Sequence, residues 1–467
     1  MHSLIDMSVW LPTVSLHSLV IVVSVLAYIL TTRAQRERRP PSIAIAWVLG
    51  MIALPYLVLP MYLMFGRRKL PRKTLPRSAA RSKAAHWAQA LIESFGLPGS
   101  SPAAINMHPD GRDSADALFS VMSSAVSRLD ICTYILGDDD FGREAMQRMI
   151  ERARCGVDVR LLLDGVGAIQ LPRACFKSLE LGGVETAIFS SLFARRTQGP
   201  RNLRNHRKMV IADGAHLWAG GRNLAAEYFL GLAGAPAWRD LTFDLRGPVA
   251  EAAAAQFELD WVAAGGKPAS ADATAVAAAV IAGTASQSAA SEAQFLPSGP
   301  DQSEDTVHAL LIDGCFQARD RMLAVTPYFV PDVSLETAMR LAARRGVRVD
   351  LVIPARSNHR LADFARSRAL RSLSQAGVNV HLRPYMSHAK AVVFDHSLAL
   401  SGSVNLDSRS LLLNYECAVV FYGRAEIDWL AQWIDAQIPE TVPFDCRPPG
   451  LLRDLCEGLL LTVAYQL

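Results

Sequence analysis

The hydrophobic pattern divides the chain into an apolar N-terminal part and a longer body. Residues 9–30 and 43–65 contain no charged residue. Each stretch is long enough to cross the hydrocarbon core of a bilayer, which takes about 20 helical residues. A cleaved signal peptide fits the first stretch poorly, because the stretch is too long and no basic segment precedes it. We therefore expect a pair of transmembrane helices within a membrane anchor of residues 1–85.

Beyond about residue 105 the pattern changes to strands that alternate with helices, and it occurs twice. Each copy has an aromatic segment, an amphipathic helix, a glycine suited to end that helix, and an apolar strand. The copies comprise residues 133–136, 141–154, 156 and 157–163, and residues 326–331, 334–345, 346 and 347–353. This repetition predicts an α/β fold built from two related units.

Composition sets the expected boundaries of these units. An Ala- and Ser-rich stretch at residues 265–305 has the character of a linker, although part of it, residues 269–282, has the composition of a helix. The first unit is then expected at 105–264 and the second at 306–467. The apolar C-terminal stretch, residues 451–467, is interpreted as core packing, with a membrane-surface helix as the alternative.

Charge and cysteine content exclude several function classes. The 467 residues are 51% hydrophobic, which is too apolar for a disordered protein. The net charge of +4 combines +10 in residues 1–85 with −6 in the remainder, and an acidic body argues against nucleic acid as a partner. Seven scattered cysteines without a CxxC motif favour neither zinc nor a disulfide framework.

Basic residues follow each apolar stretch. Four arginines lie between the stretches, and eight Lys or Arg follow the second. Because cytoplasmic flanks carry an excess of positive charge, the larger group favours a cytoplasmic location for the body. The second group is explained equally well as a solvated tether and as a contact with an anionic membrane.

The strongest chemical signal is a His-x-Lys-x4-Asp motif that occurs twice. Each copy is followed by a pair of small residues and an asparagine. The two sets are His206, Lys208, Asp213 and Asn223, and His388, Lys390, Asp395 and Asn405. One such motif would be explained as easily by a structural histidine. Two copies in a duplicated fold favour catalysis.

Spacing indicates how the motif works. Residues two apart on a strand project from one face, so His206 and Lys208 can meet the same ligand. Asp213 has the opposite parity and begins an Asp-Gly hairpin signal, so it suits fixing the turn better than touching a substrate. Asp395 has the same relation to Lys390.

Two His, two Lys and two Asn suit a phosphodiester substrate. The lysines and asparagines would hold the non-bridging oxygens. One histidine would attack phosphorus to give a phospho-histidine, and the other would act as acid and base. The residues alone leave open which histidine does which. Neither a metal nor another cofactor is required, and no carboxylate cluster suggests a metal.

At these residues the chain resembles the phospholipase D superfamily and, within it, the bacterial cardiolipin synthases. Further segments that carry the resemblance are residues 202–208, 238–240, 297–301, 326–332, 402–410 and 414–416. Ala389 replaces a frequent Ser, and Met386-Ser387 precedes His388 where an apolar neighbour is more common. Neither departure removes a reacting group.

The resemblance implies more than the spacing does. It implies two phospholipase D-like α/β/α units in a pseudo-two-fold arrangement, and a multi-pass protein of the bacterial inner membrane that converts two phosphatidylglycerols into cardiolipin and glycerol. It implies that His206 is the nucleophile and His388 the acid/base. Asp240 and Glu416 would orient the imidazoles. Arg409 would contact phosphate, although a structural ion pair explains it as well.

Two alternatives remain at this point. A membrane-bound hydrolase of the same superfamily would use the same intermediate and release it to water. A membrane scaffold that has lost activity is the non-enzymatic alternative, and the two intact motifs argue against it.

Overall fold

The computed structural model describes residues 10–35, 41–66, 69, 86–190, 202–232, 234–268 and 291–461. Several predicted features lie outside these residues. They are most of the basic segment after the second apolar stretch, the Ala-rich residues 269–282 and residues 462–467.

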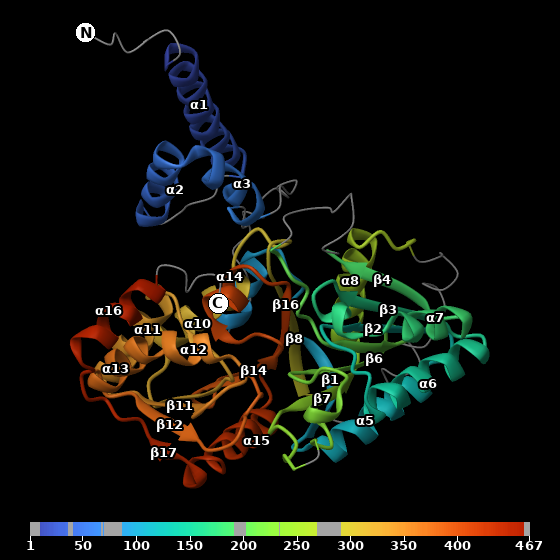
Figure 1. Ribbon diagram of the computed structural model, residues 1–467. Coiled ribbons are helices and arrows are strands. Elements are labelled where there is room, and N and C mark those ends of the chain that lie inside the picture. The colour runs from blue at the N-terminus through green and yellow to red at the C-terminus, as the bar shows by residue number, and fades with distance from the viewer. Residues whose placement is uncertain are drawn as a thin grey trace, which may run out of the picture.

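The apolar N-terminal part forms three helices, α1 (Trp10–Gln35), α2 (Pro41–Ala53) and α3 (Pro55–Phe65), which lie together beside the body (Figure 1). The expectation of one helix over residues 43–65 is wrong, because Leu54 leaves helical geometry with φ −139° and Pro55 starts a new helix. Tyr28, Met51 and Tyr62 form the contact between the three helices. Among the residues that the structure describes, none of the helices combines the length and hydropathy needed to cross a membrane.

Within the described residues, the body is built on a continuous mixed sheet of 15 strands. Its first half contributes β1 (Ser101–His108), β2 (Arg128–Thr133), β3 (Asp158–Asp164), β4 (Glu185–Phe189), β5 (Met209–Ala212), β6 (His216–Gly220) and β7 (Thr242–Arg246). Its second half contributes β8 (Ser291–Ser298), β9 (Arg321–Val325), β11 (Arg348–Pro354), β12 (Asn379–Arg383), β13 (Ala391–Phe394), β14 (Leu398–Gly402), β16 (Glu416–Phe421) and β17 (Val442–Pro443). A separate parallel pair joins β10 (Phe329–Val330) to β15 (Leu406–Asp407).

The strand order shows the duplication directly. Outward from the β8–β1 boundary it reads β1-β7-β6-β5-β2-β3-β4 on one side and β8-β16-β14-β13-β9-β11-β12 on the other, with β17 added at the edge. The two halves lie side by side about this boundary (Figure 1). The predicted α/β fold of two related units is therefore confirmed. The predicted linker must be shortened, because β8 falls within residues 265–305 and is largely buried in the sheet.

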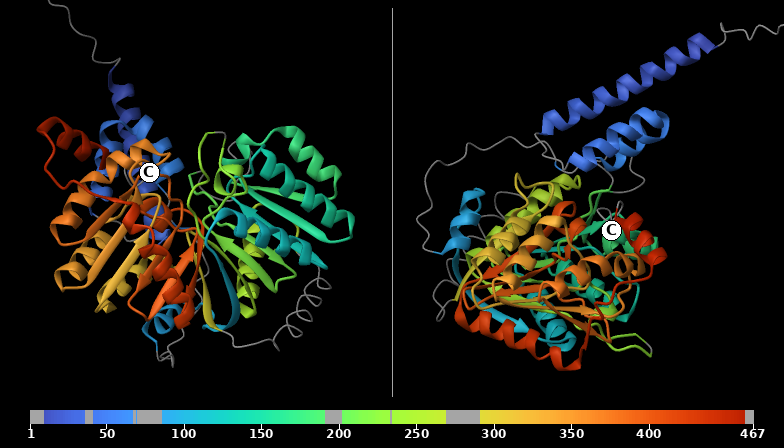
Figure 2. Two further views of the ribbon diagram at one scale, coloured as in Figure 1. Left: turned by 90° about the horizontal axis from the view of Figure 1, so that it is seen from below. Right: turned by 90° about the vertical axis from the view of Figure 1, so that its left-hand side faces the viewer.

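Helices cover both faces of the sheet (Figure 2). Those of the first half are α5 (Gly111–Ser124), α6 (Asp140–Arg154), α7 (Arg173–Leu181) and α8 (Pro248–Ala263), preceded by α4 (Trp87–Ser94). Those of the second half are α10 (Thr306–Gln317), α11 (Val333–Arg344), α12 (Arg360–Ala365), α13 (Ser367–Gln375), α14 (Ser408–Leu412), α15 (Arg424–Asp435) and α16 (Leu451–Leu461). One hydrophobic core, with residues of α8 and α15, is shared by the halves, and each half has a further core of its own.

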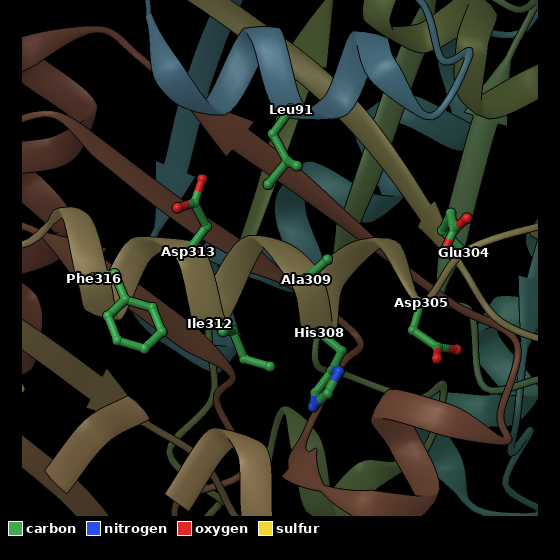
Figure 3. A pocket seen from close by; sticks show the side chains of 8 residues that line it. All are labelled: Leu91, Glu304, Asp305, His308, Ala309, Ile312, Asp313 and Phe316. Atoms are coloured by element: carbon green, nitrogen blue, oxygen red, sulfur yellow. The ribbon is translucent and has the colours of Figure 1, made fainter. Parts of the chain in front are cut away.

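A surface pocket lies where α4 packs against α10. Its lining combines apolar and acidic side chains, as Figure 3 shows: Leu91, Glu304, Asp305, His308, Ala309, Ile312, Asp313 and Phe316. None of the residues of the two His-x-Lys motifs lines it, so the site described next is a different part of the molecule.

Candidate active site

Each His-x-Lys motif is held by the opposite half of the protein. The His206 amide donates to the Tyr415 carbonyl at 2.8 Å, and the His388 amide donates to the Arg239 carbonyl at 2.7 Å. Both motifs therefore precede their strands, β5 and β13, instead of lying within them as the spacing suggested. At His206 and His388 the backbone hydrogen-bonds to the opposite half, so these residues are not part of the strand pairing within their own half.

The predicted orienting carboxylates are crossed between the halves. His206 Nδ1 lies 2.9 Å from Glu416 Oε1, and His388 Nδ1 lies 2.8 Å from Asp240 Oδ2. Both carboxyl groups are fully buried. A carboxylate only accepts hydrogen bonds, so Nδ1–H of each ring donates to its carboxylate, and Nε2 of the ring is the reactive atom.

The two carboxylates have different surroundings. Glu416 also accepts from Ser403 Oγ at 2.5 Å and from Ser410 Oγ at 2.6 Å. Asp240 accepts from the Leu241 amide at 2.7 Å, and a Cβ added at Gly221 would lie 2.2 Å from its Oδ1. Sequence reasoning missed the two serines as site residues. Both serines lie in the segment 402–410, one of the segments that carry the family resemblance, and this was the sequence feature that could have indicated them.

The lysines lie against their own histidines. Lys208 Nζ donates to the His206 carbonyl at 2.7 Å. Lys390 Nζ donates to the His388 carbonyl and lies 2.8 Å from Nδ1 and 3.2 Å from Nε2 of that ring. The charge of Lys390 acts on His206 and that of Lys208 acts on His388, so the structure brings both motifs into one electrostatic site.

Burial determines the charge states of these groups. It lowers the pKa of His206, and it lowers the pKa of His388 to about 3, so both imidazoles are neutral at neutral pH. Burial also lowers the pKa of Lys208 to about 8 and that of Lys390 to about 7. A phosphate anion would restore the charge of these lysines, which suits a site built to receive one.

The carboxylates stay ionised despite burial. Burial opposes the ionisation of Asp240, but the interaction with His388 outweighs burial and lowers the pKa of Asp240 to about 2. Burial likewise opposes the ionisation of Glu416, and the interaction with His206 outweighs burial and lowers the pKa of Glu416. Each carboxylate can therefore stabilise an imidazolium or a phosphorylated imidazole.

Aromatic rings enclose both imidazoles. Tyr134 lies edge-on to His206 with ring centroids 5.2 Å apart. Tyr228, Trp238 and Tyr328 surround His388 at 5.0 to 6.4 Å. The His206 side chain is 14% exposed, against 4% for His388. Tyr134 and Tyr328 lie in the duplicated aromatic segments, which is the sequence signal that pointed to them.

The three predicted substrate contacts lie in different surroundings. Asn223 is engaged by the protein, since its Nδ2 donates to Tyr228 Oη at 2.7 Å and its Oδ1 accepts from the Ile135 amide at 3.3 Å. Asn405 is buried, and its Oδ1 has no hydrogen-bond partner among the residues that the structure describes. Arg409 donates to the Asn202 carbonyl at 2.8 Å, and burial lowers its pKa.

The two motif aspartates lie at the far ends of their strands, away from the histidines. Asp213 has φ 52°, and its carboxylate accepts from the backbone amides of Val126, Ser127 and Arg128 at 2.7 to 2.8 Å. Asp395 has φ 50° and accepts from three amides ahead of β9 in the same way. Each carboxylate therefore holds a turn and the start of the neighbouring strand, as the parity of the motif indicated, and is not placed to react with a substrate.

Arg207, between His206 and Lys208, was not singled out from the sequence. It is fully buried, and its guanidinium binds Asp260 of α8 at 2.5 and 2.6 Å and Asp301 after β8 at 3.0 Å. Its Nε donates to the Glu416 carbonyl at 2.9 Å. It thus ties the first motif to both halves and to the carboxylate of His206. Ala389 takes the corresponding place in the second motif.

Comparison with known proteins identifies the family. The profile described as "cardiolipin synthase, PLD-like domain" matches residues 118–234 and 311–438, which hold both His-x-Lys motifs. The chain is 30% identical to cardiolipin synthase A of Pseudomonas aeruginosa over 457 residues, covering 92% of this chain and 91% of that protein.

This chain belongs to the phospholipase D-like cardiolipin synthase family. It is also 30% identical to cardiolipin synthase A of Pseudomonas putida strain W619, covering 88% of this chain and 90% of that protein. A profile described as "phospholipase D-nuclease N-terminal" matches residues 20–67, the apolar N-terminal part. Family membership confirms the resemblance on which the expected fold rested.

Among solved structures, phosphatidylserine synthase from Haemophilus influenzae Rd KW20 has the same fold. Its TM-score is 0.60 at 13% identity, covering 81% of this chain and 100% of that one. In the described part of the chain there is no group of three or more His, Cys, Asp or Glu placed to hold a metal ion.

Proposed function

We propose that the protein is a phosphatidyltransferase that converts two phosphatidylglycerol molecules into cardiolipin and glycerol. The observation that carries the proposal is the crossed pairing of His206 with Glu416 and of His388 with Asp240, each beside a lysine. Two separately oriented imidazoles fit a two-step transfer, and membership of the cardiolipin synthase family supports the lipid substrate.

In the first step Nε2 of His206 attacks phosphorus of one phosphatidylglycerol. A P–N bond forms and the bond from phosphorus to the glycerol headgroup breaks. His388 supplies the proton to the departing glycerol oxygen. Lys208 and Lys390 neutralise the charge on the non-bridging oxygens, and Asn405 and Arg409 are proposed as further contacts to the substrate.

In the second step a hydroxyl of the other phosphatidylglycerol attacks the phosphatidyl-histidine. His388 takes its proton, the P–N bond breaks, and a new phosphodiester forms. One phosphodiester replaces another, so no external energy source is required. We assign the role of nucleophile to His206, which is the more exposed of the two rings.

The N-terminal part is proposed to attach the enzyme to its substrate. Its apolar helices would anchor it in a bacterial inner membrane as a multi-pass protein, and the basic residues after the second apolar stretch favour a cytoplasmic body. The body presents no basic character suited to nucleic acid, so anionic phospholipid is the proposed partner.

Incubation of the purified full chain with vesicles of labelled phosphatidylglycerol tests the proposal. We expect cardiolipin and free glycerol as the main products, and added glycerol should reverse the reaction. Positioning of the acceptor hydroxyl is what lets it compete with water. Phosphatidic acid as the dominant product at saturating phosphatidylglycerol would identify a hydrolase instead.

A further inference from the structure

Helix α16 packs against the body with its charged side instead of its apolar side. Asp454 forms an ion pair with Arg368 of α13 at 2.9 Å, and Glu457, which is fully buried, forms one with Arg371. Arg453 completes this side by binding Glu457 at 3.0 Å. The two acidic side chains of this side of α16 therefore form ion pairs with arginines of the body.

The opposite side of α16 is apolar and faces outward. Leu451, Leu452 and Leu455 are 79%, 78% and 57% exposed. Positions three and four apart share a helix face, so these leucines form one surface, and the exposed Cys456 borders it. The expectation that this stretch packs in the core is wrong for this face, because ion pairs attach the helix from the other side. An amphipathic helix normally buries its apolar stripe, so this one requires another apolar surface.

The surroundings of this apolar face suit an anionic lipid surface. Arg360, the first residue of α12, and Arg356, four residues before it, are exposed, and α12 packs against α16. The Arg453 side chain, on the charged side of α16, is 59% exposed. Apolar residues on one side with basic residues around them are the pattern of helices that lie in the membrane interface.

Helix α16 also lies on the edge of the body that carries the site. Tyr328 contacts the ring of His388 on one side and the ring of His359, the N-cap of α12, on the other. The apolar helices α1 to α3 lie beyond the same edge (Figure 1). A bilayer that holds the N-terminal helices would therefore lie toward the edge of the body where α16 is found.

We propose that α16 is an interfacial helix whose leucines enter the boundary between headgroups and acyl chains of an anionic bilayer. It would be a second attachment besides the N-terminal part, and it would hold the site against the lipid surface. That this attachment matters for turnover rests on the proposed function. Whether α16 binds the membrane does not depend on the proposed function, so the membrane attachment and the transferase activity can each be disproved separately.

The test uses the full chain reconstituted into vesicles of phosphatidylglycerol and phosphatidylethanolamine. Cys456 is labelled with an environment-sensitive dye after the other surface cysteines, Cys155, Cys175 and Cys446, are changed to Ser. The control protein carries the dye on Cys155, which is exposed and ends α6 in the first half, whereas α16 belongs to the second half. We expect lipids carrying a shallow nitroxide to quench the dye at Cys456 and not the dye at Cys155.

Replacing the leucines tests the surface itself. Leu452→Gln with Leu455→Gln should abolish the quenching of the Cys456 dye, whereas Leu181→Gln, at a leucine that is also 79% exposed, should leave it unchanged. All three side chains are exposed, so the variants should fold. Equal quenching at Cys456 and Cys155 would overturn the proposal. So would a Cys456 dye that is shielded from aqueous iodide but not quenched by lipid, since that indicates a protein partner.

Discussion

His206 and Glu416 are 210 positions apart in the chain, yet Nδ1 of the imidazole lies 2.9 Å from the carboxylate. The reciprocal pair, His388 with Asp240, is separated by 148 positions. Each half of the protein therefore supplies the carboxylate that the other half needs. Neither His206 nor His388 has its orienting carboxylate in its own half, so both halves are needed to complete the site.

Loss of either histidine should abolish turnover, because covalent capture and proton transfer are separate tasks. We expect His206→Ala and His388→Ala each to lower the rate by at least about 10²–10⁴-fold. The measurement is cardiolipin formation from labelled phosphatidylglycerol. A phospho-enzyme that accumulates in His388→Asn and is absent from His206→Asn would agree with the assigned roles. Near wild-type activity in either alanine variant would contradict the two-histidine scheme.

Neutralising Glu416 should impair the nucleophile without unfolding the protein. Glu416→Gln keeps the shape of the side chain but presents an amide that can no longer act as a charged acceptor for His206. We expect activity to fall by about 10²–10⁴-fold with the pH profile altered. Ser410→Ala removes one hydrogen bond to the same carboxylate and should cost far less. Equal losses in both variants would show that packing, not the charge, is what matters.

Removing Arg207 should destabilise the protein strongly. Arg207→Met leaves Asp260 and Asp301 without their buried partner, and breaking such a pair costs about 3–5 kcal/mol. Denaturant unfolding of the detergent-solubilised chain measures this cost. Arg447→Ala is the matched control, since Arg447 is 85% exposed in its pair with Asp445 and its loss should change stability little. A similarly small change in the free energy of unfolding for Arg207→Met would show that the ion pairs of Arg207 do not hold the two halves together.

Substrate binding should take up a proton at neutral pH. The pKa of His388 is lowered to about 3, so this ring is neutral in the free protein and needs a proton to act as an acid. A bound phosphodiester anion raises the pKa of His388 and also those of Lys208 and Lys390, which burial lowers to about 8 and about 7, so binding takes up protons and should weaken as the pH rises. Calorimetry of short-chain phosphatidylglycerol binding to His206→Asn, in buffers with different protonation enthalpies, measures the uptake. The double variant that also carries His388→Asn should take up less, and equal uptake would assign the proton to another group.

Activity should persist in EDTA. Lys208 and Lys390 supply the positive charge that a metal ion would otherwise bring to the phosphate, so no divalent ion is needed in either step. Turnover of phosphatidylglycerol in detergent micelles, where divalent ions affect the lipid phase less, is the measurement. Complete loss of activity that added Mg²⁺ or Zn²⁺ restores would contradict this.

Local features of the site were accessible from the sequence. The two His-x-Lys motifs, the hairpin turns at Asp213 and Asp395 and the alternation of helices and strands depend on spacings of a few residues. A repeated pattern of this kind indicates both the fold and the reacting groups. Asp240 and Glu416 were reached through the family resemblance, since their own sequence context does not distinguish them from ordinary acids.

What the sequence by itself determined is thus the duplicated α/β body and the identity of the histidines and lysines, because these follow from local periodicity and from residue chemistry. Only the tertiary structure decided which carboxylate faces which histidine, that Arg207 joins three distant segments, and that α16 turns its leucines outward. Each of these depends on contacts between segments tens to hundreds of positions apart. Such contacts arise from the packing of the two halves and of α16 on α13, and no short-range pattern encodes them.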